Sequence, residues 1–493
     1  MKKKSIFLYD DHKLLSRRDF MAAAASAFSA SLTLSPAVAL LMDQYARAAC
    51  GGASGSALSA LPAFVQFNLS GGAMLAANFV PRDTGGNLIP SMNLMGLGSA
   101  ASLSLSGDDL GASQMFFSGS GFLAGLRSAA SGISSTTTGL TRASQYLNRT
   151  RVIGVVARSR DDTEMNPYDL TGLVAAAGLS GSLLPNLSTS GFRQTPSLIN
   201  PPSPIVLNSY SDLENATGLG GALQGLKDRR GTRAVEGLFQ TIQRLSESEA
   251  RRLLSANVKN ATELENLISC ATGSNVSVVG TDPPSVDVRL QSDIATIWGI
   301  TPTSSASSVE VIFASSVYAT LMRYAGATRL ERGGYDYHNG TRTTGDARDE
   351  EAGLFAGRML QTAAALNQPL FLFVSTDGSC RSEDSDASDA PWVSDRGQAG
   401  LLLMLAYDPS GRPGSSVTGF ERHQIGYLTS GQAADQEFIA GWDAEMASLA
   451  VFANYLRLGL GASWKSTFES VLGSVGANNP FTGSNESRIL RFG

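Results

Sequence analysis

Six short segments of the chain carry the hydrophobic patterns of buried β-strands. Residues 63–69 alternate between apolar and polar side chains, which is typical of a strand. Residues 369–374 and 401–407 are almost continuously apolar, as in strands that are covered on both faces. Three further segments are shorter or rich in β-branched residues, at residues 151–157, 204–208 and 328–332. Together they predict the strands of a central sheet.

Helical patterns lie between these strands. Residues 167–177 begin with Pro167 and are followed by Gly178, which favour the first turn and the end of a helix. Residues 85–145 are rich in Gly, Ser, Ala and Thr and predict loops with short helices. Helical composition or spacing recurs in three later segments, at residues 309–325, 349–366 and 445–458. A strand followed by a polar turn and a helix indicates an α/β fold.

The segment from about 210 to 272 contains helical spacing alone. Apolar residues recur on one helical face, and Ser246 with Glu249 forms a capping box that begins a second helix. We therefore expect an all-helical insertion in the domain. A layer over the sheet is the simplest interpretation of it, and a lid or an interface are the alternatives.

The first 49 residues have the order of a secretory leader. Lysines and the pair Arg17-Arg18 precede an apolar stretch at residues 21–41, and a small-residue cleavage site follows. The paired arginines indicate the twin-arginine route, so we expect the mature protein in the periplasm, at the cell surface or outside the cell. Serines and Pro36 interrupt the apolar stretch, which disfavours a membrane anchor, and we expect no stable transmembrane segment after cleavage. Lipidation at Cys50 is a further alternative.

We expect residues 50–493 to form a single domain, because a 43% hydrophobic content is enough for a large core. The leader holds seven basic and four acidic residues, so its removal takes the net charge from −5 to −8. Only three lysines follow residue 49 and the arginines are dispersed. The mature chain therefore has no basic stripe, which argues against a nucleic-acid partner.

The three cysteines, Cys50, Cys270 and Cys380, are too far apart in sequence for a zinc cluster or a disulfide scaffold. A bridge between Cys270 and Cys380 and two free thiols are both compatible with export.

Glycine and acidic residues follow three of the predicted strands. Gly71-Gly72 follows the first strand, Gly333 to His338 follow the strand at 328–332, and Asp377-Gly378 follow the strand at 369–374. In α/β proteins, binding sites lie at the carboxyl ends of the strands. These three turns are therefore the candidate site.

The same segments resemble a known family. The leader, the stretch FVQFNLSGGA at residues 64–73, and the stretches YAGATRLERGGYDYHN, LFLFVSTDGSCR and WVSDRGQAG between residues 324 and 400 resemble twin-arginine-exported bacterial proteins of unknown function in the alkaline phosphatase and sulfatase superfamily. The resemblance implies a three-layer α/β/α sandwich around a mostly parallel sheet. It covers most of the mature chain and is loose between residues 85 and 300.

The resemblance also implies a set of metal ligands, because the superfamily holds hard divalent cations with carboxylates and imidazoles at the strand ends. Four residues match its motif positions, namely Asp336, His338, Asp377 and Asp395. From the residues alone, each can also be explained as a polar strand end, a turn or a solvated loop.

Two positions depart from that family. Ala73-Met74-Leu75 stands where the glycine turn should supply an acid, and Arg396 stands where a histidine should follow Asp395. Met is no ligand for a hard cation, and arginine cannot ligate one. The chain has three histidines, His12, His338 and His423, too few for a histidine-rich two-metal site. At most one divalent cation is compatible with these residues.

Two functions follow from this comparison. The first is a noncatalytic or weakly active exported protein on an alkaline-phosphatase-like scaffold. The second is a metal-dependent hydrolase of phosphate or sulfate esters, in which the four matching residues hold one cation. The missing acid and Arg396 favour the first function. Arg396 also allows a third, in which the site binds an anionic group without cleaving it.

Overall fold

The computed structural model describes a large part of the chain after residue 59. The described residues are 60–90, 96–97, 103–158, 168–179, 181, 184, 186–189, 204–216, 228–231, 233–234, 237, 241, 244, 286–337, 342–376, 378–379, 381–382, 392–393, 400–441 and 443–493. The chain divides into two units, one of residues 1–52 and 232–281 and the other of residues 53–231 and 282–493. Nearly all of the first unit lies outside the described residues, so the following description concerns the second.

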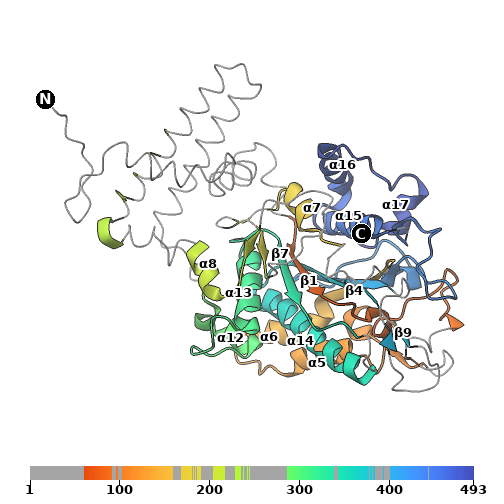
Figure 1. Ribbon diagram of the computed structural model, residues 1–493, viewed down its shortest axis with the longest axis horizontal. Coiled ribbons are helices and arrows are strands. Elements are labelled where there is room, and N and C mark those ends of the chain that lie inside the picture. Colours follow the sequence, from red (N-terminus) through yellow and green to blue (C-terminus); the bar gives the residue numbers. More distant parts are fainter. Residues whose placement is uncertain are drawn as a thin grey trace, which may run out of the picture. The chain divides into compact units, whose positions relative to one another are not determined.

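An eight-stranded sheet forms the centre of this unit (Figure 1), in the order β12-β4-β11-β8-β1-β7-β5-β6. The strand β11 is antiparallel to both of its neighbours, and every other neighbouring pair is parallel. The predicted mostly parallel sheet is thus confirmed. The strands are β1 (Ala63–Leu69), β4 (Thr150–Val156), β5 (Leu187–Ser188), β6 (Ile205–Val206), β7 (Thr328–Arg332), β8 (Leu370–Thr376), β11 (Leu401–Tyr407) and β12 (Gln424–Ile425).

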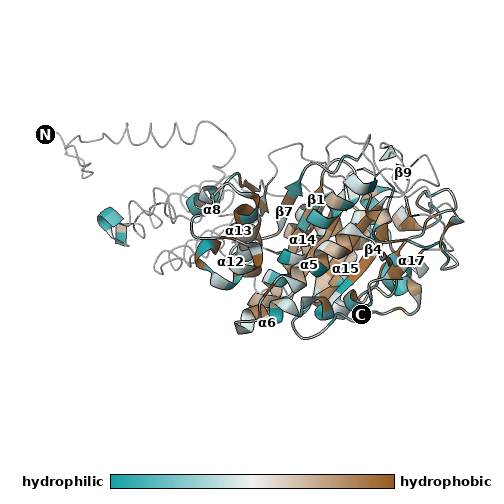
Figure 2. Ribbon diagram, turned by 90° about the horizontal axis from the view of Figure 1, so that it is seen from below, coloured by the Kyte–Doolittle hydropathy of each residue, from teal (hydrophilic) through white to brown (hydrophobic). Residues whose placement is uncertain are grey.

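Helices cover both faces of this sheet, which makes three layers. Phe67 of β1 packs edge-on against Phe313 and Phe355 of the first helical layer. Phe64, three positions earlier, packs against Tyr455 of the second layer. The first layer contains α5 (Gly121–Ser131), α6 (Thr138–Ser144), α12 (Ser292–Trp298), α13 (Val309–Leu321) and α14 (Arg342–Leu366), and the second contains α7 (Thr171–Ala176), α15 (Ala444–Leu460), α16 (Trp464–Ser474) and α17 (Ser484–Ile489). Hydrophobic residues are concentrated in the strands and in the helices packed against them (Figure 2).

All six predicted strands are present, and the helices differ from their predictions mainly in length. The helix α13 ends at Leu321, because Arg323 has a left-handed backbone with a φ of 60°. The helix α14 begins at Arg342, before the predicted start. Short helices occur between residues 103 and 145, as expected. The two-residue strands β2 (Leu105–Ser106) and β3 (Phe116–Phe117) also lie there and were not predicted, while β9 (Arg381–Ser382) pairs with β10 (Trp392–Val393).

The expected helical insertion is described only in part. The helix α8 (Tyr210–Ala216) lies there, and Leu213 is buried in the core of the first layer. Most of residues 217–285 lies outside the described residues, as do Cys50, Cys270 and Cys380.

Glycines allow the helices α5 and α14 to pack main chain against main chain. A Cβ atom at Gly353 of α14 would lie 2.0 Å from the carbonyl oxygen of Phe122, and one at Gly125 of α5 would lie 2.1 Å from that of Glu350. Since such separations are impossible for real carbon atoms, these helices can approach this closely only with glycine at both positions.

Gly353→Ala is therefore expected to lower the free energy of unfolding by about 2–3 kcal/mol, as forced overpacking does. Gly473→Ala in α16 is the matched control, because a Cβ atom there would meet nothing within 4 Å. An exposed helical glycine replaced by alanine stabilises a protein by about 0.5–1 kcal/mol. Urea denaturation of both variants measures the difference, and equal stabilities for the two would contradict the close packing.

Candidate active site at the strand ends

The three predicted site turns lie at one edge of the sheet. The central strand β1 pairs in parallel with β7 on one side and β8 on the other, so that Leu69 is opposite both Arg332 and Thr376. Each strand therefore ends at the same level, and the turns that follow them are neighbours. We call this edge the strand-end site.

The glycine turn after β1 contacts the two flanking turns directly. A Cβ atom at Gly71 would lie 2.6 Å from the amide nitrogen of Asp336, and one at Gly72 would lie 3.3 Å from the backbone of Gly378. Both glycines have left-handed backbones, with φ of 114° and 102°. The backbone conformation thus favours glycine at both positions, and the close backbone contact requires it at Gly71.

Hydrogen bonds fix the three turns to one another. The amide of Tyr335 donates to the carbonyl of Ser70 at 3.2 Å, and the amide of Ala73 donates to Oγ1 of Thr376 at 2.9 Å. The first bond joins the turns after β1 and β7, and the second joins the turn after β1 to the last residue of β8. Hydrogen bonds therefore hold together, at the strand-end site, three segments that are far apart in the sequence.

Among the sequence-predicted ligands, Asp336 is in the described part of the chain, exposed at this edge next to Gly71. Asp377 itself lies outside the described residues, but Thr376 and Gly378 on either side of it belong to the edge. The other predicted functional residues lie outside the described residues, namely His338, Asp395, Arg396 and the leader pair Arg17 and Arg18.

Met74 occupies the position at which the resemblance implies an acid. Its side chain is fully buried within the core of the first layer. Its sulfur accepts a hydrogen bond from Oγ of Ser379 at 3.3 Å. The side chain is therefore part of the packing beneath the turn, and a thioether is a poor ligand for a hard cation.

A buried carboxyl group beneath this edge was not found from the sequence. Asp349 of α14 is fully buried, and it accepts hydrogen bonds from the Tyr337 hydroxyl at 2.6 Å and from Nδ2 of Asn78 at 2.7 Å. Burial raises the pKa of Asp349 to about 7, although the bonds from Tyr337 and Asn78 act in the opposite direction. This carboxyl group joins α14 to the segments after β7 and β1.

Aromatic side chains surround the same carboxyl group. The ring of Tyr337 lies 6.2 Å from that of Tyr335 and 5.5 Å from that of Trp392. The Tyr335 hydroxyl and the Trp392 indole N–H are buried, and neither has a hydrogen-bond partner in the described part of the chain. Burial raises the pKa of the Tyr335 hydroxyl well above its ordinary value, so it is a neutral donor.

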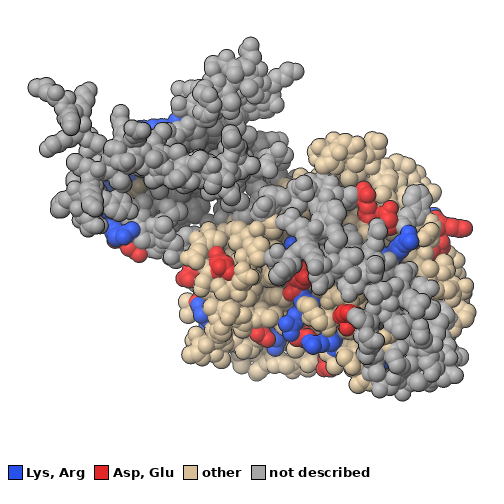
Figure 3. All heavy atoms as spheres, in the orientation of Figure 1, with Lys and Arg blue, Asp and Glu red and all other residues tan. Residues whose placement is uncertain are grey.

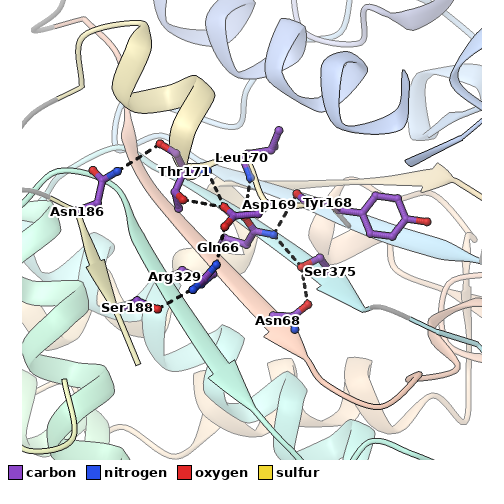
Figure 4. A network of polar contacts seen from close by, with 10 residues as sticks. All are labelled: Gln66, Asn68, Tyr168, Asp169, Leu170, Thr171, Asn186, Ser188, Arg329 and Ser375. Atoms are coloured by element: carbon purple, nitrogen blue, oxygen red, sulfur yellow. Dashed lines mark hydrogen bonds and ion pairs between the residues drawn. The ribbon is translucent and has the colours of Figure 1, made fainter. Parts of the chain in front are cut away.

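The two polar residues of β1 lie on the face towards the second helical layer and belong to a polar network (Figure 4). Gln66 donates to Oγ of Ser375 at 3.0 Å, and that hydroxyl donates to Oδ1 of Asn68 at 3.0 Å. Arg329 of β7 forms an ion pair with Asp169 at 2.5 Å, and their side chains are only 7% and 4% exposed. The polar positions of the alternating pattern in β1 thus face a buried network and not solvent.

Charges on the described surface are mixed. On the face that Figure 3 presents, lysine and arginine side chains are interspersed with aspartate and glutamate side chains.

Within the ranges that the structure covers, no three His, Cys, Asp or Glu residues come together in a way that could hold a metal ion. None of the helices described above has the length and apolar character to cross a membrane.

Comparisons with known proteins identified no similar protein. The chain matches no protein-family model, no curated protein and no solved structure.

Proposed function

We propose that this chain is an exported, noncatalytic or weakly active protein on an alkaline-phosphatase/sulfatase-like scaffold. In this proposal the leader with Arg17 and Arg18 directs it along the twin-arginine route to the periplasm or the cell surface. The strand-end site keeps the architecture of a hydrolase site without its full set of ligands. Arg396 gives it the capacity to bind an anionic group without cleaving it.

The environment of Met74 is the observation that carries this proposal. Its side chain is fully buried and its sulfur accepts a hydrogen bond from Ser379. An acid at this position would be a buried carboxylate among apolar side chains, which is costly without a partner. The turn after β1 is therefore packed as core, and it contributes no ligand from Ala73, Met74 or Leu75.

A metal-dependent hydrolase of phosphate or sulfate esters is the second candidate. One observation favours it, because Asp336 is exposed at the strand-end site and both neighbours of Asp377 lie there too. In that function Asp336, His338, Asp377 and Asp395 hold one divalent cation, which polarises the ester and stabilises the developing charge.

Metal analysis of the mature protein with an aryl phosphate and aryl sulfate assay separates the two functions. We expect the wild type and Asp336→Ala to contain the same amount of divalent cation, with no stoichiometric cation lost in the variant. We also expect the two proteins to have the same turnover. Asp336→Ala is the test variant, and Glu350→Ala, at an exposed position of α14, is the control for loss of an exposed acid.

A further inference from the structure

Four arginines gather at a second place in the fold, away from the strand-end site. Arg151 lies near the start of β4, Arg412 follows the end of β11, and Arg422 lies in the short helix Phe420–His423 before β12. Arg82 follows the glycine turn, and its amide donates to Gln424 of β12. We call these four residues the arginine cluster.

Strand pairing places this cluster near the opposite end of the sheet. The strand β11 is antiparallel to β4, so that its last residue, Tyr407, is opposite Thr150, the first residue of β4. Arg151 and the segment that carries Arg412 therefore lie at the amino end of the parallel strands. The strand-end site lies at their carboxyl end.

Three of these arginines hold one loop, residues 107–114. Arg412 donates to the carbonyls of Asp108 and Asp109, Arg82 donates to that of Gln114 at 3.4 Å, and Arg422 donates to Oγ of Ser113 at 3.1 Å. These acceptors are neutral. They orient the guanidinium groups without compensating their charge.

The cluster is short of negative charge. Among the residues that the structure describes, no carboxylate lies within ion-pair distance of its four arginines. The nearby Asp109 carboxylate is paired with Arg127 at 2.8 Å. Burial lowers the pKa of Arg151, and the charges of Arg422 and Arg412 lower it further. The arginines thus repel one another in a half-buried setting.

Three guanidinium N–H groups in the cluster are also unsatisfied. Nε of Arg82, Nη1 of Arg151 and Nε of Arg412 are buried, and none has a hydrogen-bond partner within the described ranges. A buried charged donor without an acceptor is costly. An anionic group bound among the arginines would supply acceptor oxygens and neutralise the charge at the same time.

We infer that the arginine cluster binds a tetrahedral oxyanion of the phosphate or sulfate type. Arginine suits this ligand, because its planar guanidinium group presents several donors to an oxyanion. The neutral acceptors of the loop hold three of the guanidinium groups in place before the ligand arrives, which reduces the entropy lost on binding. Oxyanion binding at the arginine cluster does not depend on the strand-end site or on whether that site holds a metal.

His423 provides a spectroscopic probe inside the cluster. It is buried, and its Nε2 accepts a hydrogen bond from Nε of Arg422 at 2.7 Å. Burial lowers the pKa of His423 to about 4, and the charges of Arg422, Arg151 and Arg82 act in the same direction. An oxyanion beside these arginines would offset their charges and raise the pKa of the imidazole.

Calorimetric titration of the mature protein with inorganic phosphate and inorganic sulfate, in chloride buffer of constant ionic strength, tests the inference. We expect saturable binding that Arg151→Gln weakens about tenfold or more, since one charge-assisted bond has this value. Arg127→Gln is the matched control, because its charge is already paired with Asp109, and we expect less than a twofold change. Titration with glycerol 2-phosphate shows whether the ligand is a phosphate ester or the free phosphate ion. If it binds as phosphate does, the site accepts an ester group, and if only phosphate binds, the free ion is the ligand.

A second measurement remains informative if Arg151→Gln does not fold. In the intact protein, NMR titration of the histidine ring signals is expected to show a higher pKa for His423 with phosphate than with chloride, with His338→Gln used for assignment. Arg422→Lys keeps the charge and is expected to bind more weakly than the intact protein. Absence of saturable binding with an unchanged His423 titration would overturn the inference, as would equal losses in Arg151→Gln and Arg127→Gln.

Discussion

Asp169→Ala is expected to lower the free energy of unfolding by about 3–5 kcal/mol, because breaking a buried ion pair from one side leaves a charge without its counter-charge. Arg329 and Asp169 are almost fully buried, and their charged atoms are 2.5 Å apart. Arg329 also donates a hydrogen bond to the neutral hydroxyl of Ser188 at 3.2 Å (Figure 4). A neutral hydroxyl cannot replace the carboxylate.

Chemical denaturation of paired variants isolates this effect. Removing both charges together, as Asp169→Leu with Arg329→Met, is expected to cost much less than Asp169→Ala alone, because no buried charge remains. Arg348→Ala is the surface control, since Arg348 lies 3.4 Å from Glu351 with its side chain 47% exposed. Its loss is expected to cost less than about 1 kcal/mol. Similar losses in the free energy of unfolding for Asp169→Ala and Arg348→Ala would contradict the expected cost of breaking the buried ion pair.

Asp349 is expected to make stability fall as the pH rises. Its pKa is about 7 in the folded protein and about 4 when unfolded, so the folded state holds a proton that the unfolded state has lost. The contribution is fully present below about pH 4 and is lost as the pH rises through 7. Linkage gives a change of up to about 4 kcal/mol across this window.

Asp349→Asn measures this contribution, because an amide can still meet Tyr337 and Asn78 but does not titrate. We expect the wild type to lose about 3–4 kcal/mol relative to this variant between pH 4 and pH 8. His423 titrates in the opposite sense over the acid half of this range, since its pKa is lowered, but it is common to both proteins and cancels in the difference. Parallel stability curves would contradict the buried, titrating carboxyl group.

Much of the fold could be predicted from the sequence, because the long strands carry their own patterns. The strands β8 and β11 are seven residues each and fully buried, so continuous apolar runs reveal them. The strands β5 and β12 are two residues each, too short for any periodicity. Their place in the sheet depends on tertiary pairing, which no local pattern encodes.

The start of α14 was missed for a similar reason. Its first turns contain charged residues and Gly345, at which a Cβ atom would lie 3.0 Å from the ring of Trp392. A helical turn that buries a glycine carries no apolar repeat. Asp349 does lie on the buried stripe of this helix together with Ala352, Ala356 and Met359. An acid on an otherwise apolar stripe is the signal that could have identified it.

The candidate site was only partly accessible from the sequence. The convergence of the turns after β1, β7 and β8 followed from glycine and acidic residues at three strand ends, and the parallel order of these strands agrees with it. The arginine cluster could not be predicted, because its members come from four separated segments. Charge counting also gave no indication, since the chain as a whole is acidic.

Turnover of aryl phosphate and aryl sulfate by the purified mature protein, with and without added divalent cations, tests the central claim most directly. A noncatalytic or weakly active scaffold predicts rates that are the same for the wild type, Asp336→Ala and Glu350→Ala, with no stoichiometric metal lost in Asp336→Ala. Cation-dependent turnover that Asp336→Ala abolishes and Glu350→Ala retains would contradict the claim and identify a working hydrolase.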